Sequence, residues 1–217
     1  MDMKKSSVII LLIILASFII AVYFYPQMPD EMASHWSIKG EPDGYMLKFW
    51  GLFLMPIISL GLFLLFLLIP RIDPLKANIK KFRKYFDGFM VLITIFLFYI
   101  YLLGIAWNLG KRFNMSQMIT PALGIIFYYC GVLTENAKRN WFIGIRTPWT
   151  LSSESVWNKT HKTGGKLFKI AGLTAFLGML FPNYVFYFIF IPVLLVVFYA
   201  IIYSYFKYQK EKRGDND

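Results

Sequence analysis

The segment from Asn140 to Gly165 gathers side chains that can bind a partner or take part in a reaction. Arg146 can offer its guanidinium to a phosphate or to a partner's carboxylate, or it can donate to loop carbonyls beside Pro148. His161 can be read as a base or, more simply, as a solvated helix residue. The three tryptophans are typical of interface anchors or of a loop core, with a recognition surface as the alternative. The candidate binding or signalling residues are Asn140, Gly144, Arg146, Thr147, Pro148, Trp149, Thr150, Glu154, Trp157 and His161.

A short helix is expected within this segment. Thr150 or Ser152 can cap its start, Glu154 suits its positive N-terminal end, and Gly164-Gly165 can end it. Glu154 would then share one face with the tryptophan and the histidine that follow it by three and seven residues. Such a helix, with aromatic and basic residues, suits a phospholipid surface.

A second cluster lies between Pro26 and Lys48, where turn-forming residues alternate with aromatic ones. This composition predicts a compact folded loop with little helix, in which Pro42-Asp43-Gly44 forms a turn. Acidic residues and His35 could converge on a cation, but the simpler reading has Trp36 and Tyr45 as headgroup anchors and His35 in a hydrogen bond. No metal site is therefore predicted. The candidate binding residues are Pro29, His35, Trp36, Gly40, Asp43 and Gly44.

The composition decides the class of protein. The 217 residues are 58% hydrophobic and only 16% charged, with a mean hydropathy of +0.55, whereas a soluble domain carries about a quarter charged residues. The net charge of +11 favours the anionic inner leaflet as a partner, without direct nucleic-acid binding. The single Cys130 excludes an internal disulfide. No common enzyme motif is present, so no catalytic residue and no cofactor is predicted.

Six apolar stretches approach the roughly 17–25 residues that a helix needs to cross a bilayer. They are Val8–Tyr25, Phe49–Ile69, Phe89–Trp107, Met118–Thr134, Leu167–Phe181 and Tyr184–Phe206. The first has no convincing cleavage site after it and is read as an uncleaved span. We therefore expect an all-α integral membrane protein, with residues 1–217 forming one domain: a bundle of six transmembrane helices, a folded loop over 26–48 and a long loop over 135–166.

Lysine and arginine are distributed unevenly between alternate connections, with eighteen on one side and four on the other. The richer side holds Lys4, Lys5, Arg71, Lys76, Lys80, Lys81, Arg83, Lys84, Lys138, Arg139, Arg146, Lys159, Lys162, Lys166, Lys207, Lys210, Lys212 and Arg213. The poorer side holds Lys39, Lys48, Lys111 and Arg112. Positive connections stay in the cytoplasm. Both termini and the 135–166 loop are therefore predicted to be cytoplasmic, and the 26–48 loop to face outward.

The apolar stretches contain few groups that can carry charge. Lys169, near a stretch end, is the one Asp, Glu, Lys, Arg or His within them. Pumps and ion-coupled transporters place such groups inside the bilayer. Proton-coupled transport is therefore disfavoured, while a passive role stays open.

Two motifs resemble a known family. The run Gly144-Ile145-Arg146-Thr147-Pro148-Trp149-Thr150, with Trp157 after it, resembles the SdpI-like bacterial membrane proteins, which include toxin-immunity proteins. The outer loop resembles a domain of unknown function found in the same proteins, through Pro29, His35-Trp36, Gly40 and Asp43-Gly44. The resemblance implies a place in the bacterial cytoplasmic membrane and immunity to a secreted peptide toxin. In the best-known system, the toxin-bound protein also captures a cytoplasmic transcriptional repressor.

We therefore expect a non-catalytic protein that binds a peptide toxin through residues 26–48 or its helix surface, while residues 140–166 report occupancy to a cytoplasmic partner. Two alternatives remain open. One is a membrane enzyme or lipid handler that uses Arg146 and His161 on phospholipid headgroups. The other is a small transporter or exporter.

Overall fold

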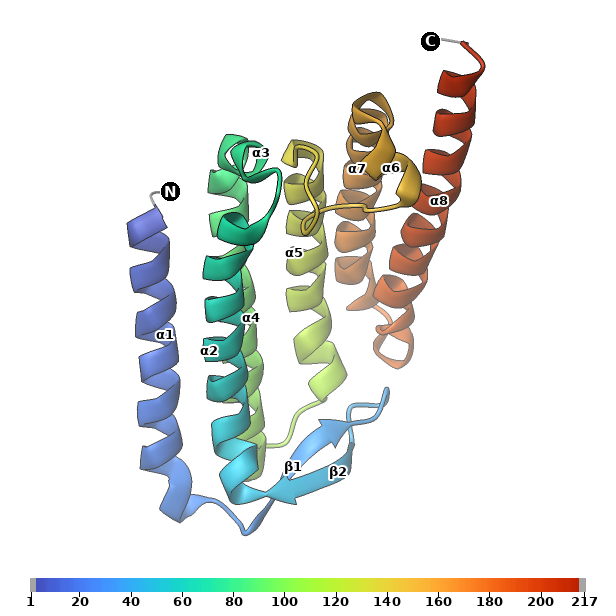
Figure 1. Ribbon diagram of the computed structural model, residues 1–217. Coiled ribbons are helices and arrows are strands. Elements are labelled where there is room, and N and C mark those ends of the chain that lie inside the picture. Colours follow the sequence, from blue (N-terminus) through green and yellow to red (C-terminus); the bar gives the residue numbers. More distant parts are fainter. Residues whose placement is uncertain (1–2, 215–217) are drawn as a thin grey trace.

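The computed structural model describes residues 3–214, and long helices standing side by side dominate it (Figure 1). The long helices are α1 (Met3–Phe24), α2 (Lys48–Ile72), α4 (Arg83–Asn108), α5 (Met115–Asn136), α7 (Glu154–Gly178) and α8 (Tyr187–Lys212). The short elements are α3 (Lys76–Lys81), α6 (Pro148–Ser152), the 3₁₀ helices η1 (Tyr25–Gln27) and η2 (Pro182–Tyr184), and the strands β1 (Glu31–Trp36) and β2 (Pro42–Leu47).

Within residues 3–214, five helices are long and apolar enough to cross a membrane: α1, α2, α4, α5 and α8. They correspond to five of the six predicted stretches, which confirms a mostly helical, multi-pass membrane protein. The sixth stretch, Leu167–Phe181, forms the second half of α7, whose first half is polar. A tight connection built on η2 joins α7 to α8.

The prediction that Gly164-Gly165 ends a short helix is wrong, because α7 continues through both residues. A Cβ atom on Gly165 would lie 2.4 Å from the Glu135 Cγ, and one on Gly172 would lie 2.5 Å from the Tyr128 backbone nitrogen. The glycines therefore let the backbones of α5 and α7 approach closely, as small residues do between membrane helices. This packing outweighs the roughly 1 kcal/mol that each glycine costs inside a helix.

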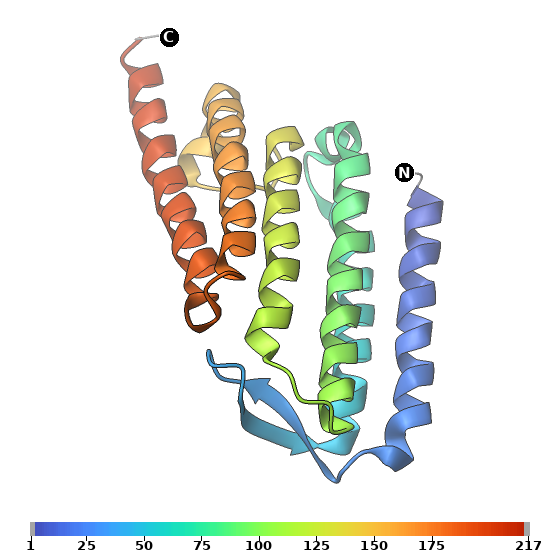
Figure 2. The ribbon, with the colours of Figure 1, turned by 180° about the vertical axis from the view of Figure 1, so that it is seen from behind.

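All four basic segments lie at one end of the bundle. The start of α1, the α2–α4 connection with α3, the α5–α7 connection with α6, and the end of α8 meet there, while the β-hairpin lies at the other end (Figures 1 and 2). The helices thus alternate in direction along the chain, and this is the grouping that the charge count predicts.

The 26–48 loop folds as an antiparallel β-hairpin, which is the departure from a purely helical protein. The turn predicted at Pro42-Asp43-Gly44 is wrong, because these residues begin β2. The chain reverses at residues 37–41 instead, where the Ser37 N–H donates to the Glu41 carbonyl over 2.8 Å and Gly40 takes a φ of +80°. Proline is tolerated as the first residue of a strand, and glycine adopts positive φ readily.

Helices α4 and α5 extend beyond the predicted stretches and carry carboxylates that those stretches lacked. Asp87 is buried and accepts from the Arg83 Nε over 2.6 Å, and Glu135 of α5 pairs with Lys169 of α7 over 2.7 Å. Both carboxylates lie near the basic end of the bundle, and each has a cationic partner.

Candidate functional site

In the hairpin, His35 and Asp43 face each other across the two strands. The His35 Nδ1 lies 2.5 Å from the Asp43 Oδ1, and their side chains are 73% and 48% exposed. The predicted hydrogen bond of His35 is therefore confirmed. Gly44 lies opposite His35 in the strand register, where a Cβ would come within 2.9 Å of the His35 Cβ. Gly44 thus makes room for the histidine.

The tip of the hairpin docks on the start of α5. The Asn114 Nδ2 donates to the Lys39 carbonyl over 2.8 Å, and the Asn114 Oδ1 caps the helix by accepting from the Gln117 N–H over 3.0 Å. A Cβ on Gly40 would overlap the Asn114 amide at 2.3 Å. Gly40 is therefore required both for the turn and for this contact. Pro29, by contrast, is exposed in the connection before β1.

Trp36 is half-buried, whereas Tyr45 is 58% exposed. The Trp36 ring packs edge-on against Trp107 of α4, with ring centroids 6.0 Å apart. Its Nε1 is buried and has no hydrogen-bond partner within residues 3–214. A cavity of about 550 Å³ lies between the hairpin, α4, α5 and Phe186, and its lining includes both Trp36 and the His35–Asp43 pair. We call it the outer cavity.

At the opposite end, residues 137–147 connect α5 to α6, and we call them the signature loop. Asn140 is fully buried and folds the loop around itself: its Oδ1 accepts from the Phe142 and Ile143 N–H groups over 2.9 and 2.6 Å. Its Nδ2 donates to the carbonyls of Lys138 and Ile143, both over 2.8 Å. Asn140 is thus a structural centre of the loop.

His161 joins α7 to the signature loop. Its Nδ1–H donates to the Trp157 carbonyl over 2.9 Å, and its Nε2 accepts from the Ile145 N–H over 3.0 Å. These partners define a neutral imidazole with its proton on Nδ1. Burial agrees with this assignment, because it lowers the His161 pKa to about 4. Both ring nitrogens are therefore occupied.

The helix face predicted to lie on the membrane surface instead forms a core. Trp157 and His161 are 0% and 1% exposed, and only Glu154 faces outward. The Trp157 Nε1 donates to the Ala137 carbonyl over 2.8 Å. Gly144, with φ of +112°, lies against the rings, where a Cβ would come within 2.4 Å of the His161 Nε2. The reading of His161 as a solvated residue is wrong.

The threonines of the motif cap α6. Thr147 and Thr150 form a reciprocal capping box, and Pro148 occupies the first turn of the helix, where proline fits well. The Thr147 hydroxyl also lies 3.0 Å from that of Ser204 in α8. The predicted caps, Thr150 or Ser152, are wrong for α7, which Ser153 caps by accepting from the Val156 N–H over 3.2 Å.

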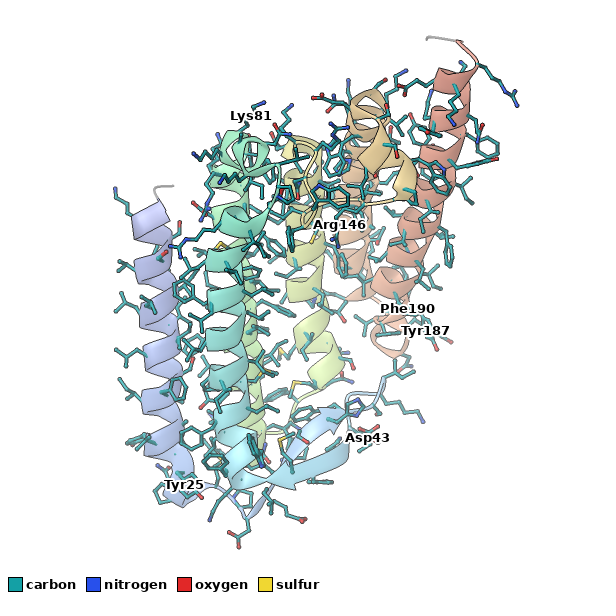
Figure 3. All side chains as sticks on the ribbon, viewed as in Figure 1. Tyr25, Asp43, Lys81, Arg146, Tyr187 and Phe190 are labelled. Atoms are coloured by element: carbon teal, nitrogen blue, oxygen red, sulfur yellow. The ribbon has the colours of Figure 1, made fainter. Side chains whose placement is uncertain are left out.

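Arg146 is exposed, and its Nη1 donates to the Trp141 carbonyl over 2.8 Å, which confirms the loop-bracing interpretation. Figure 3 shows it in the connection between α5 and α7, toward the end of the bundle away from the hairpin. Trp149 packs edge-on against Tyr205, with centroids 5.2 Å apart, while Trp141 is 51% exposed. Of the three tryptophans, Trp157 is therefore core and Trp141 is surface.

Sequence reasoning missed the residues outside the motif that hold the signature loop. Asp73 accepts from the Trp141 N–H over 2.9 Å, and the Asn78 Nδ2 donates to the Arg139 carbonyl over 2.9 Å. The Asp-Pro pair at residue 73 is a recognisable turn signal, and the Leu75 N–H indeed donates to the Asp73 carboxylate over 2.6 Å. No linear pattern indicates that this turn meets a loop 68 residues later.

Across residues 3–214 no three His, Cys, Asp or Glu side chains gather closely enough to hold a metal ion.

Comparison with known proteins bears on both ends of the bundle. Residues 136–204 match the SdpI/YfhL protein family, and residues 12–60 match a domain of unknown function, DUF1648. Over 207 residues the chain is 27% identical to "Immunity protein SdpI" of Bacillus subtilis (strain 168), a match that covers 95% of this chain and 97% of that protein. No solved structure matches the chain. The predicted resemblance to the SdpI-like family is confirmed.

Proposed function

From its likeness to the SdpI-like family along nearly its whole length, we propose that this chain is a membrane immunity protein that binds a secreted peptide toxin without catalysis. The observation that carries the proposal is the 27% identity, over 95% of the chain, to a protein named for immunity. The match spans the hairpin, the signature loop and the bundle between them, so both candidate sites lie within the shared region.

We place the basic end in the cytoplasm and count α7 as a sixth span. The concentration of Lys and Arg segments at that end supports the orientation. In α7 the span is the predicted stretch Leu167–Phe181, which begins in the apolar second half of the helix; it is short for a span and gains length from Lys166, which can reach toward the headgroups. The buried faces of its polar first half pack under the signature loop.

The outer cavity is the proposed toxin site. It is mostly apolar, and its lining includes the half-buried Trp36 ring and the exposed His35–Asp43 pair. A membrane-active peptide offers both apolar side chains and backbone carbonyls, so its chemistry fits this cavity.

A cytoplasmic repressor is the proposed second partner, and it would meet the exposed part of the signature loop. Trp141 is 51% exposed although hydrogen bonds fix its backbone at both the N–H and the carbonyl. A rigid, exposed tryptophan is typical of a protein interface. Neighbouring Arg146 and Pro148 are exposed as well.

The enzyme alternative needs His161 as a base, but both of its nitrogens are engaged and the ring is buried. This supports a non-catalytic role. The transporter alternative gains Asp87 and Glu135, yet each is held by a cation near one end of the bundle. The buried His161 and the two ion pairs therefore favour a binding protein over an enzyme or a transporter.

The test is expression in a sensitive Gram-positive host, followed by challenge with a panel of membrane-active peptides. We expect raised tolerance to at least one peptide. Trp36→Phe replaces the indole with a smaller ring that has no N–H and should reduce protection, whereas Trp50→Phe, at a ring that is 49% exposed, should not. Unchanged killing curves for every peptide, with the protein present in the membrane, would contradict the proposal.

A further inference from the structure

A second cavity, of about 560 Å³, lies at the end of the bundle opposite the hairpin. Helices α2, α4, α5, α7 and α8 form its walls, and Phe142–Thr147 of the signature loop borders it. The walls are apolar, with Phe66 and Ile69 from α2, Phe127 and Leu133 from α5, and Val193 and Val197 from α8. Its volume falls within the roughly 300–1,000 Å³ of ligand-binding pockets. We call it the inner groove.

Arg146 is the one charged residue that lines the inner groove. Only its Nη1 has a protein acceptor within residues 3–214, the Trp141 carbonyl, and no carboxylate there lies within ion-pair distance of it. The remaining guanidinium N–H groups are available to an anion. A planar guanidinium presents parallel donors that match two phosphate oxygens.

The position of this cation is fixed before any ligand arrives. The Ile145 N–H on its N-terminal side is held by the His161 Nε2, and Thr147 on its C-terminal side is locked by the capping box and by the Ser204 hydroxyl. Preorganisation of this kind lowers the entropy lost on binding.

The helix surfaces beside the inner groove face lipid. Exposed apolar residues continue along α2 and α8 next to the lining positions, and they include Leu65 and Leu68 of α2 and Phe198 and Ile202 of α8. Hydrocarbon chains are therefore the medium at the groove. The surrounding connections carry most of the lysines and arginines of the chain, which raises the local concentration of anionic headgroups.

We propose that the inner groove binds one anionic phospholipid, with an acyl chain along the apolar walls and the phosphate on Arg146. An apolar cavity with a single unpaired cation beside it matches the two ends of such a molecule. A zwitterionic lipid carries the same phosphate, but its cationic group would lie near Arg146 and the basic connections. Net-negative headgroups are therefore preferred.

The experiment uses the full chain, purified in mild detergent, stripped of lipid and titrated with phosphatidylglycerol or phosphatidylcholine under native mass spectrometry. We expect one phosphatidylglycerol to bind more tightly than the rest and more tightly than phosphatidylcholine. Arg146→Gln should weaken that first binding event by about tenfold, the loss of one charge-assisted contact. Arg213→Gln, at the exposed end of α8, is the matched control and should leave it unchanged.

A second pair of variants tests the acyl chain. Val197→Trp fills the inner groove and should abolish the first binding event, whereas Leu195→Trp, at a position 63% exposed on the same helix, should not. Glycerol phosphate and inorganic phosphate test for a headgroup-only site, and we expect neither to bind. Thermal unfolding of each variant reports whether it has folded.

Three results would overturn the proposal: equal binding of both lipids, unchanged binding by a folded Arg146→Gln protein, or unchanged binding by Val197→Trp. A co-purified peptide mass that Val197→Trp removes would identify a polypeptide as the occupant instead. Should Arg146→Gln fail to fold, Arg146→Lys is the second variant, because it keeps the charge but lacks the parallel donors of the guanidinium. It should retain the preference for phosphatidylglycerol with weaker binding. No toxin enters these measurements, so they stand or fall independently of the immunity proposal.

Discussion

The rings of Trp157 and His161 stack with their centroids 3.8 Å apart, and the same histidine accepts the Ile145 N–H on its Nε2. This hydrogen bond between α7 and the signature loop therefore exists only while Nε2 keeps its lone pair. Protonation would place two N–H groups face to face and would charge a buried ring. The stability of the loop is thus linked to the protonation state of one histidine.

We predict that this linkage destabilises the protein in mild acid. The His161 pKa is lowered from 6.5 to about 4 by burial, so between these pH values the unfolded chain binds the proton and the folded chain does not. The contribution of His161 to the free energy of unfolding is therefore complete above about pH 6.5. It falls by up to about 3 kcal/mol as the pH drops towards 4. Unfolding in detergent at pH 7.5 and 4.5 measures this loss. His161→Gln should flatten the dependence, His35→Gln should preserve it, and identical profiles for both variants would argue against the assignment.

Gly144 should be far less replaceable than a glycine that only supplies a positive φ. Gly144→Ala introduces both backbone strain and a Cβ at 2.4 Å from the His161 Nε2, and we expect a loss of about 2–4 kcal/mol. Gly110, with φ of +94° and no atom within 4 Å of its Cβ position, should cost about 1 kcal/mol when changed to alanine. Chemical denaturation of the two variants compares them directly. Equal losses would mean that strain alone decides and that the histidine moves aside freely.

Which features were predictable depends on whether their cause is local. Continuous apolar runs predicted α1, α2, α4, α5 and α8 to within six residues at each end, because a long helix needs only its own sequence and a lipid solvent. The end expected at Gly164-Gly165 failed, because the reason for those glycines is the backbone of α5. The turn expected at Pro42-Asp43-Gly44 failed similarly, since Gly44 makes room for His35 on the other strand.

The candidate site divides along the same line. The motif residues were identified as a group, but their roles depend on partners far along the chain. Asn140 and Thr147 proved to be hydrogen-bonding centres of the loop. His161 was expected to be solvated but is buried. Arg146 stays exposed, as its residue type suggests, and its Nη1 donates to the Trp141 carbonyl.

The orientation of the bundle should follow its charge. A reporter fused after Asp217 is expected to be active in the cytoplasm, and an epitope tag inserted within residues 37–40 should be accessible on intact cells. The insertion falls in the hairpin turn, so an accessible tag must be accompanied by normal protein levels. A tag within residues 152–155 provides the opposite control, and its detection from outside would invert the model of the bundle in the membrane.

The signature loop should separate into a core part and a surface part, which two tryptophans test. Trp157 is fully buried, so Trp157→Ala should cost about 3–5 kcal/mol and lower protein abundance, with any loss of immunity following the loss of protein. Trp141 is 51% exposed and is fixed by backbone bonds that do not involve its ring, so Trp141→Ala should change stability by no more than about 0.5 kcal/mol.

If the exposed ring receives a regulator, Trp141→Ala should nevertheless alter the transcriptional response to toxin at normal protein abundance. Abundance, survival and transcript levels measured in the same cells distinguish the two variants. A regulator-binding surface predicts that Trp141→Ala changes the transcriptional response without changing protein abundance. Strict proportionality between abundance and every phenotype in both variants would contradict such a surface.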